Sequence, residues 1–381
     1  MMLKQVGHSD LAGQGAAMQV MASGRILYVG SMRTGEGTTV VDADEPSRPR
    51  IIGRLPACPC TKMTKTQTAG DLLLVNYEQG AGGRAMRTGF SVFDISKPRK
   101  PTEVCYYDTG GLGVHRIWYS GGRYAYLSAV PPGFADRMLI IIDMKNPEQP
   151  EESGRWWLPG QWIDGGEEPR WPATLKIKLH HALVHGGSAY LGYWDGGLIV
   201  LDITDVSRPR PVSRVSWAPH QGGCTHTALP LPGRRLLAVV DESTRELDKE
   251  PPKYVRLMDI TDERVPKVLS WYRPDPQGAA WPGVRFGPHN LHENRPESYI
   301  SEDVLFVTCF AAGLKILDIS DPHNPREIES FVPQEAPQTP QLNDVFVTTE
   351  GLVYVTDRSG LGLYILEKKE TWQAPLFKDQ R

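Results

Sequence analysis

The most constraining feature of this chain is a short phrase that recurs along its whole length. Its clearest copy is Leu-Asp-Ile-Thr-Asp at residues 201–205, and degenerate copies surround six other acidic residues. The seven acidic markers are Asp42, Asp94, Asp143, Asp202, Asp259, Asp318 and Glu367. Successive markers lie 49 to 59 residues apart, a spacing typical of propeller blades, whose small sheets bury their faces only against neighbouring blades. The repeat therefore predicts an all-β, seven-bladed β-propeller.

The even spacing favours a single domain over residues 1–381, although a chain of 381 residues often forms two domains. The best-preserved copy, residues 180–217, has the pattern of four successive strands separated by Gly, Asp and Pro. The last copy, residues 344–367, has only three, whereas residues near 3–9 carry a spare outer-strand pattern. We therefore predict that the N-terminal strand pairs into the last blade and closes the propeller, which removes the open sheet edges.

Several copies resemble a known repeat family. The segments Gly-Gly-Leu-Ile-Val-Leu-Asp-Ile-Thr-Asp, Gly-Leu-Lys-Ile-Leu-Asp-Ile-Ser-Asp-Pro and Ser-Val-Phe-Asp-Ile-Ser-Lys-Pro are similar to LVIVD-repeat β-propeller proteins. That group is distantly similar to the selenium-binding protein and methanethiol oxidase propellers. The resemblance covers nearly the whole chain, but its motif residues belong to turns and cores. It therefore implies a fold and no particular chemistry.

Bulk properties exclude several classes of partner. A net charge of −3 gives no electrostatic footprint for nucleic acid, and no apolar run is long enough to span a membrane. The N-terminal residues lack the apolar stretch of a signal peptide, and the five cysteines are an odd number spread over different copies. We therefore expect a cytoplasmic protein that binds neither nucleic acid nor membranes. The sequence leaves the oligomeric state open.

Four histidines occupy one position of the repeat. Counting back seven residues from the glycine after each inner strand gives His115, His180, His226 and, in the last copy, Asp344. His289 belongs to the same set because Gly-Pro-His at 287–289 matches Gly-Val-His at 113–115. In the first two copies the count gives Ala17 and Met63, with Lys62 beside the latter. The start of each inner strand lies near the propeller axis, so we expect these four imidazoles to converge.

Converging neutral imidazoles are ligands for a first-row transition metal, each giving one nitrogen at about 2.0–2.2 Å. Four nitrogens with no thiolate suit Fe(II), which we favour, or Cu or Zn. The ligand set is similar to the four-histidine iron centre of carotenoid-cleavage oxygenases, by analogy of ligands alone. Two choices stay open: His181 in place of His180, and His292 in place of His289. The alternative to metal binding is that such histidines simply donate hydrogen bonds to neighbouring blades or water.

Further residues are candidates for the chemistry around such a centre. Metal-bound histidines usually donate their second N–H to a carboxylate or carbonyl, and Glu293 and Asp344 are the preferred partners and candidate catalytic residues. The other carboxylates considered for this role are Glu78, Asp195, Asp241 and Glu242. Two long aromatic links, residues 156–171 and 271–286, precede His180 and His289, so we expect them to overhang the site. The predicted pocket residues are Trp162, Trp171, Trp281, Arg285 and Phe286.

These features favour a metal-dependent oxidoreductase, dioxygenase-like, that acts on a small apolar or aromatic molecule. One alternative is a metal-dependent lyase or hydrolase that uses a metal-bound water at the same site. A second alternative, from a different class, is a non-catalytic propeller scaffold that binds a protein partner. The recurring aspartates precede turns, and we expect them to accept backbone N–H bonds there rather than to form a carboxylate site.

Overall fold

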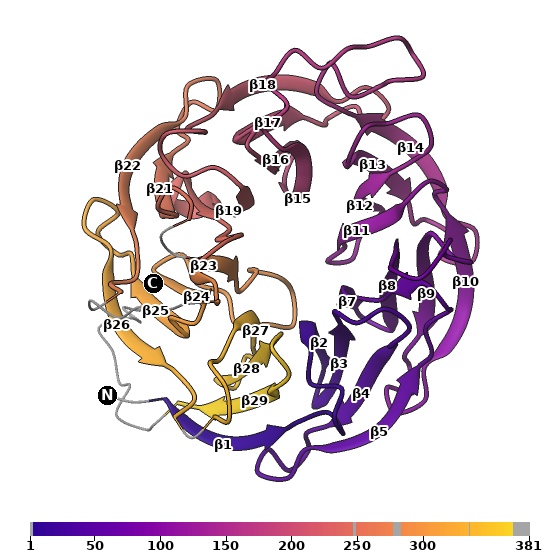
Figure 1. Ribbon diagram of the computed structural model, residues 1–381, viewed down its shortest axis with the longest axis vertical. Coiled ribbons are helices and arrows are strands. Elements are labelled where there is room, and N and C mark those ends of the chain that lie inside the picture. The colour runs from indigo at the N-terminus through magenta and orange to yellow at the C-terminus, as the bar shows by residue number, and fades with distance from the viewer. Residues whose placement is uncertain (1–2, 247–248, 277–282, 335, 369–381) are drawn as a thin grey trace.

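The computed structural model describes residues 3–246, 249–276, 283–334 and 336–368 and shows an all-β chain. Among these residues the only helical segment is a short 3-10 turn, Pro232–Arg234, and no helix is long and apolar enough to cross a membrane. The strands form curled antiparallel sheets that Figure 1 shows around a common centre. This arrangement is of the β-propeller type.

Consecutive strands group by four, each strand pairing antiparallel with the next. The first two groups are β2 (Ala17–Ser23), β3 (Ile26–Ser31), β4 (Thr38–Asp42), β5 (Arg50–Leu55), and β7 (Thr66–Ala69), β8 (Leu72–Gln79), β9 (Gly89–Asp94), β10 (Thr102–Asp108), with β6 (Thr61–Lys62) also pairing with β8. The next two are β11 (Gly113–Trp118), β12 (Tyr124–Val130), β13 (Met138–Asp143), β14 (Glu151–Trp156), and β15 (Ile177–His185), β16 (Ser188–Trp194), β17 (Leu198–Asp202), β18 (Arg210–Val215).

The remaining groups complete the chain. They are β19 (Thr225–Leu231), β20 (Leu236–Asp241), β21 (Val255–Asp259), β22 (Lys267–Tyr272), and β23 (Phe286–Leu291), β24 (Val304–Phe310), β25 (Leu314–Asp318), β26 (Arg326–Phe331). The last group is β27 (Leu342–Val347), β28 (Leu352–Asp357) and β29 (Gly362–Glu367). The edge of β29 pairs antiparallel with β1 (Lys4–Ser9), from the opposite end of the chain.

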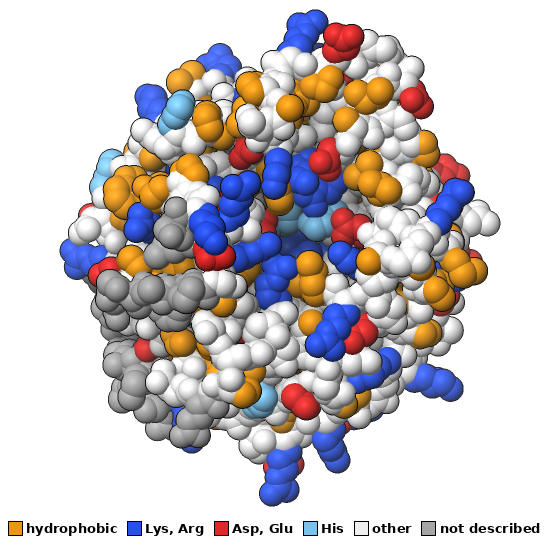
Figure 2. Space-filling model, in the orientation of Figure 1, with side chains coloured by type: hydrophobic (Ala, Val, Ile, Leu, Met, Phe, Trp, Pro, Cys, Tyr) orange, Lys and Arg blue, Asp and Glu red, His pale blue; other side chains and the backbone are white. Residues whose placement is uncertain are grey.

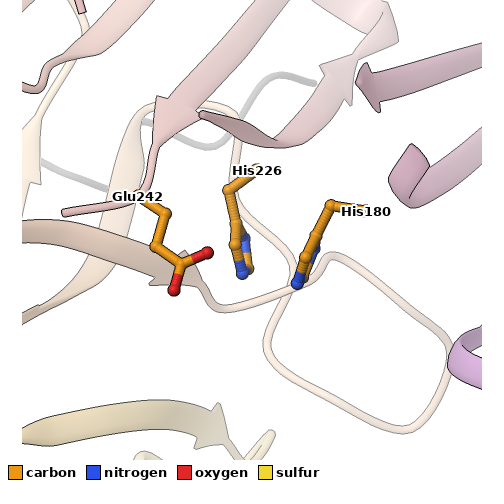
Figure 3. A group of neighbouring side chains, drawn as sticks. All are labelled: His180, His226 and Glu242. Carbon is orange, nitrogen blue, oxygen red and sulfur yellow. The ribbon is translucent and has the colours of Figure 1, made fainter. Parts of the chain in front are cut away.

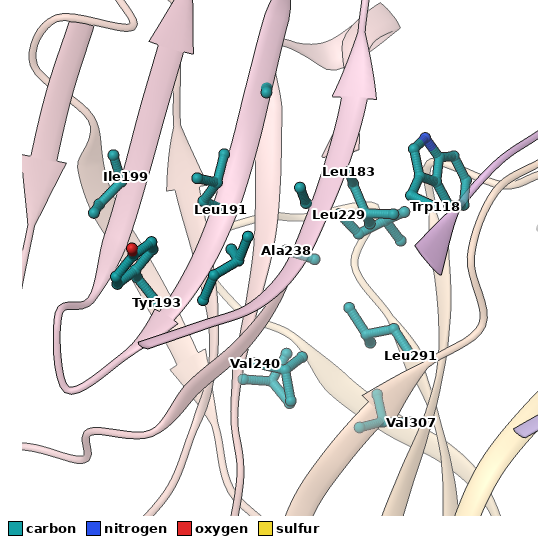
Figure 4. Close-up of a cluster of buried hydrophobic side chains, with 14 of the residues drawn as sticks. Trp118, Leu183, Leu191, Tyr193, Ile199, Leu229, Ala238, Val240, Leu291 and Val307 are labelled. Atoms are coloured by element: carbon teal, nitrogen blue, oxygen red, sulfur yellow. The ribbon is translucent and has the colours of Figure 1, made fainter. Parts of the chain in front are cut away.

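Apolar packing between neighbouring groups forms the core. Inner strands are buried on both faces, whereas the outer strand of each group, such as β18, is largely exposed. Figure 4 shows Leu191, Leu229 and Val307, from three successive groups, in one buried cluster. Burying a side chain of this size stabilises the fold by about 1.5–3 kcal/mol, so contacts between groups hold the sheets together.

The recurring aspartates are turn residues, as the sequence predicts. Each accepts a hydrogen bond from the backbone N–H two residues later, for example Asp202 from Thr204 at 2.9 Å and Asp318 from Ser320 at 2.9 Å. The Thr204 hydroxyl also donates to Asp202, and these hydrogen bonds lower the pKa of the Asp202 carboxyl. The repeat phrase therefore fixes the turn before each outer strand and lies away from the centre.

Candidate metal centre

Backbone bulges position the four predicted histidines. In β11 the pairing with β12 skips His115, and in β19 the pairing with β20 skips His226. The registers of β15 and β23 shift across the segments that contain His180 and His289. A bulge leaves its extra residue unpaired and redirects the side chain, so each imidazole leaves the sheet at the start of an inner strand.

The four imidazoles lie in one continuous contact chain at the centre. Ring centroids are 4.9 Å apart for His115 and His180, 3.5 Å for His180 and His226, and 4.5 Å for His226 and His289. Nε2 of His115 is 3.1 Å from Nε2 of His180. Two nitrogens that each lie about 2.1 Å from one ion, at near-tetrahedral angles, are separated by about 3.4 Å, close to this distance.

Hydrogen bonds at the far side of three rings orient them. Nδ1 of His115 donates to Glu78 at 2.9 Å, Nδ1 of His289 donates to the Asn343 carbonyl at 2.7 Å, and Nδ1 of His226 is 2.8 Å from the Thr227 hydroxyl. This pattern resembles metal-bound histidine, whose second nitrogen is held by a carboxylate, carbonyl or hydroxyl. Among the described residues, Nε2 of His226 and Nδ1 of His180 are buried with no hydrogen-bond partner. Buried unpartnered nitrogens are costly, so this arrangement suits a ligand.

A carboxylate joins the imidazoles. Nitrogens of His180 and His226 and an oxygen of Glu242 lie within 4.8 Å of one another, as Figure 3 shows. Nε2 of His289 is 3.9 Å from Oε1 of Glu242, and the same oxygen accepts a hydrogen bond from Arg285 at 2.9 Å. The predicted ligand set contained only histidines. Glu242 follows the end of β20, and its sequence position had suggested only a partner of a metal-bound histidine.

Burial keeps the imidazoles neutral. Desolvation, followed by the nearby charge of Arg137, lowers the pKa of His115 to about 4, although Glu78 acts in the opposite direction. Desolvation also places the pKa values of His180, His226 and His289 well below the ordinary value. Each ring therefore carries one unprotonated nitrogen at neutral pH, which metal binding requires.

The two open choices of histidine differ clearly in their contacts. Nε2 of His181 is 2.8 Å from Glu293, which also accepts a bond from Arg116 at 2.6 Å, so His181 belongs to a separate buried ionic group. Nε2 of His292 donates to the Tyr299 carbonyl at 2.7 Å, while its Nδ1 accepts from the Val347 N–H. Both nitrogens of His292 are therefore occupied. The contacts place His180 and His289 in the cluster.

The two predicted catalytic carboxylates lie beside the cluster, not in it. Glu293 pairs with His181 and Arg116, and these charges lower its pKa despite the opposing effect of burial. Asp344 accepts a hydrogen bond from the Val20 N–H at 3.1 Å, and burial raises its pKa to about 7. The structure shows neither carboxylate bonded to one of the four imidazoles.

In the last repeat, Asn343 replaces Asp344 at the histidine position. The pairing of β27 with β28 skips Asn343, as the pairing of β11 with β12 skips His115. Counting from the turn glycine misses this because the two turns are equally long, Ile117 pairing with Leu127 and Val345 with Val355, but the glycine lies one residue later in the last turn. The Asn343 side chain is fully buried, and its amide has no hydrogen-bond partner among the described residues. Its backbone carbonyl holds His289, so it adds an unpartnered polar group next to the cluster.

The remaining predicted positions are core residues or lie in the links. Ala17 and Met63 are buried in apolar clusters, and Lys62 pairs with Glu78 through the backbone. Trp162 is 42% exposed and stacks on Phe134, and Figure 1 shows the link before β15 over the rim. Of the other predicted pocket residues, Trp171 packs against the largest core cluster and Phe286 is buried within it. Arg285 donates a hydrogen bond to Glu242, and Trp281 lies outside the described residues.

Two aromatic residues near the cluster have an unusual backbone. Trp194 and Phe310 end the second strands of their groups, with φ of 45° and 49°. Bulky residues rarely adopt this left-handed conformation, and such strain often accompanies a functional site. The Phe310 ring stacks on His289 with centroids 4.5 Å apart. The sequence gives no sign of this conformation, since neither position carries glycine or asparagine.

Comparisons with known proteins agree with this fold. Residues 14–55, 85–109, 182–216 and 299–332 match the LVIVD repeat, so the chain contains LVIVD repeats, a β-propeller-type sequence repeat. A comparison with curated proteins gives no significant match.

Solved structures similar to this chain include three of different origin. The computationally designed Ika8 protein has 9% identity, covers 96% of this chain and 100% of its own, and has a TM-score of 0.57. Sqt1 of Saccharomyces cerevisiae has 9% identity, coverage of 97% and 100%, and a TM-score of 0.59. A putative 6-phosphogluconolactonase from Bacteroides fragilis has 12% identity, coverage of 81% of both chains, and a TM-score of 0.55. At such low identity these likenesses concern the fold alone.

Proposed function

We propose that this protein is a metal-dependent enzyme, an oxidoreductase of the dioxygenase type, with its metal held by His115, His180, His226 and His289. The observation that carries the proposal is the convergence of four neutral imidazoles, with Nε2 atoms of His115 and His180 3.1 Å apart. The buried, unpartnered Nε2 of His226 supports it further. A scaffold protein has no need of such a costly arrangement at its centre.

Fe(II) is the metal that we favour, and the donor set also suits Cu or Zn. The four imidazoles add no negative charge of their own, and a metal ion held by them would supply polarisation of dioxygen or of a substrate oxygen. Glu78 orients His115, the Asn343 carbonyl orients His289, and the stacked Phe310 ring shields one side from water. The proposed substrate is a small molecule with an apolar or aromatic body.

Glu242 favours a second candidate function at the same centre. Its carboxylate lies within 4.8 Å of ligand atoms of His180 and His226, where it can accept a proton from water. A lyase or hydrolase that activates a metal-bound water would use this carboxylate as general base. Zinc in the purified protein, without oxygen consumption, would favour this candidate.

The proposal includes a specific architecture. We propose that the strand groups are seven blades of one propeller domain over residues 1–381, closed by the pairing of β1 with β29. The antiparallel register of Lys4 with Glu367 and of Ser9 with Leu363 supports this. We also propose a distant relation to the selenium-binding protein and methanethiol oxidase propellers, and a cytoplasmic location.

Metal analysis tests the proposal. Protein purified without added metal should contain close to one transition metal per chain, and His226→Ala should remove most of it. His185→Ala is the matched control because His185 is exposed at the end of β15, a strand of the sheet that also contains β19 and His226. Less than about 0.2 metal per chain in the wild-type protein, unchanged by His226→Ala, would refute the proposal. Oxygen consumption with aromatic substrates then separates the oxidative from the hydrolytic candidate.

A further inference from the structure

A positively charged hollow lies over the histidines. Figure 2 shows histidine at the floor of a central depression whose walls carry mostly Lys and Arg side chains. Several cations lie close enough to act on the cluster and its partners: Arg137 and Lys62 lower the pKa of Glu78, and Arg358 lowers that of His289. Lys178 lies beside Arg137, and Arg285 is bonded to Glu242. The cations come from different strand groups, so the fold itself directs them toward one place.

Some of these cations are already paired within the protein. Arg285 donates to Glu242 at 2.9 Å, and the Lys178 ammonium lies 3.4 Å from Asp136. Glu78 accepts its hydrogen bond from His115. The three carboxylates Glu242, Asp136 and Glu78 therefore already have partners within the protein.

Arg137 and Arg358 have no equivalent partner. Arg137 is only 6% exposed, yet among the described residues its Nε has no hydrogen-bond partner, and its one carboxylate neighbour there, Asp136, is 3.9 Å away. Within the described part of the chain, the Arg358 side chain forms no hydrogen bond or ion pair with a carboxylate. A buried guanidinium such as that of Arg137 is costly unless its donors are satisfied, and desolvation lowers the pKa of Arg137 and of the half-buried Arg358. Both side chains therefore suit an anionic ligand.

Aromatic rings hold the two guanidinium groups in place. The Arg137 guanidinium carbon lies 5.4 Å from the centroid of the Trp194 ring, and that of Arg358 lies 5.8 Å from the Phe310 ring. These rings are the two with left-handed backbone conformations, φ 45° and 49°. Cation–π contact fixes the plane of a guanidinium without using its N–H donors, which stay available for a ligand.

The guanidinium groups of Arg137 and Arg358 both interact with the same part of the cluster. The charge of Glu242 affects Arg137 and Arg358 alike, and Glu242 is within 4.8 Å of ligand atoms of His180 and His226. Geometry agrees, because the Phe310 ring beside Arg358 stacks on His289, and the Arg137 carbonyl accepts a hydrogen bond from Leu179, next to His180.

We propose that the hollow binds the oxyanion group of the substrate, a carboxylate or phosphate, through Arg137 and Arg358, and that this contact directs the rest of the molecule toward the histidine cluster. Planar guanidinium groups bind such oxyanions through paired N–H donors. This inference deepens the proposed function and rests on it for the identity of the ligand as a substrate. The anion site itself needs only the two arginines.

Calorimetric titration of metal-free and metal-loaded protein tests the inference with three probes. Benzoate and phenyl phosphate carry the two oxyanions, while benzamide has the shape of benzoate without the charge. We expect an oxyanion probe to bind at least tenfold more tightly than benzamide to both forms of the protein, and more weakly at high salt. The tighter of benzoate and phenyl phosphate identifies the oxyanion.

Variants assign the binding to the two arginines. Arg358→Gln, at a half-buried position, and Arg137→Gln should each weaken the oxyanion about tenfold to a hundredfold. Arg264→Gln, which changes an exposed arginine paired with Asp262, is the control and should leave binding unchanged. If Arg137→Gln fails to fold, Arg358→Gln carries the test alone.

The outcomes separate the two proposals. Oxyanion binding to protein that never takes up metal would preserve the anion site and refute the metal centre. A metal-loaded protein that binds benzamide as well as both oxyanions, or binding unaffected by Arg358→Gln, would overturn the anion site and leave the metal centre standing.

Discussion

Replacing Glu78 with glutamine tests whether the His115 contact is part of a metal centre. The substitution keeps the size of the side chain and an acceptor oxygen 2.9 Å from Nδ1 of His115, but it removes the negative charge. Burial raises the pKa of Glu78, yet His115, Arg137 and Lys62 lower it overall from 4.5 to about 2. That pKa difference means that the surroundings favour the charged form of Glu78 by about 3 kcal/mol. This energy is an upper limit for the electrostatic interaction between Glu78 and His115.

The expected effect on metal affinity is smaller than this limit. Loss of an outer partner of a metal-bound histidine typically weakens binding 10- to 100-fold, or about 1.4–2.7 kcal/mol. We therefore expect Glu78→Gln to lower metal affinity by that factor, and Glu78→Ala to lower it more because the acceptor is lost altogether. Competition with a chromophoric chelator at pH 7.5 measures the change.

Glu151→Gln is the matched control, because Glu151 is exposed at the start of β14. Its metal affinity should equal that of the wild-type protein. If Glu78→Gln changes affinity by less than twofold while the protein remains folded, the Glu78–His115 contact does not serve a metal, and the argument from ring orientation fails.

Three further predictions concern stability. Burial lowers the pKa values of His115, His181 and His292 to about 4. Between pH 6.5 and 4 the unfolded chain therefore binds protons at these histidines that the folded protein does not bind. Burial raises the pKa of Asp344 to about 7, which acts in the opposite direction. Metal-free protein should thus lose several kcal/mol between pH 7 and 4.5 in urea unfolding, and an unchanged midpoint would contradict this. Leu191→Ala, at a fully buried position, should cost about 2–5 kcal/mol, while Leu112→Ala, 52% exposed, should cost far less; equal costs would show that the core is misassigned. Gly7→Ala in β1 should lower the melting temperature because its Cβ would lie 1.9 Å from the Pro46 carbonyl, whereas Gly53→Ala has open space and should not; equal melting temperatures would show that β1 does not pack against Pro46.

The sequence was sufficient to predict the all-β fold and the convergence of the four histidines, because both follow from the repeat. Strand and turn residues recur at fixed offsets, and a ligand on one inner strand has counterparts on its neighbours. Glu242 and Asn343 were harder to predict for a physical reason. Glu242 follows a second strand, whose end varies between repeats, and Asn343 depends on a bulge and on a turn glycine that lies one residue later than its counterpart.

The anion site could not be predicted from the repeat at all. Arg137 and Arg358 occupy different kinds of position, one just before β13 and the other just after β28. Only the three-dimensional arrangement shows that the charge of Glu242 acts on both side chains, and that neither has a carboxylate within hydrogen-bond distance among the residues that the structure describes. The Trp-rich links, which attract attention in the sequence, contribute Arg285 to the cluster through its bond with Glu242.

X-ray absorption at the metal edge of the purified protein reports the ligands of the proposed centre. We expect about four nitrogen or oxygen neighbours at about 2.0–2.2 Å with the outer-shell scattering of imidazole rings, and a loss of imidazole scattering in His226→Ala. The absence of bound metal, or a spectrum dominated by sulfur at about 2.3 Å, would contradict a centre built from His115, His180, His226 and His289.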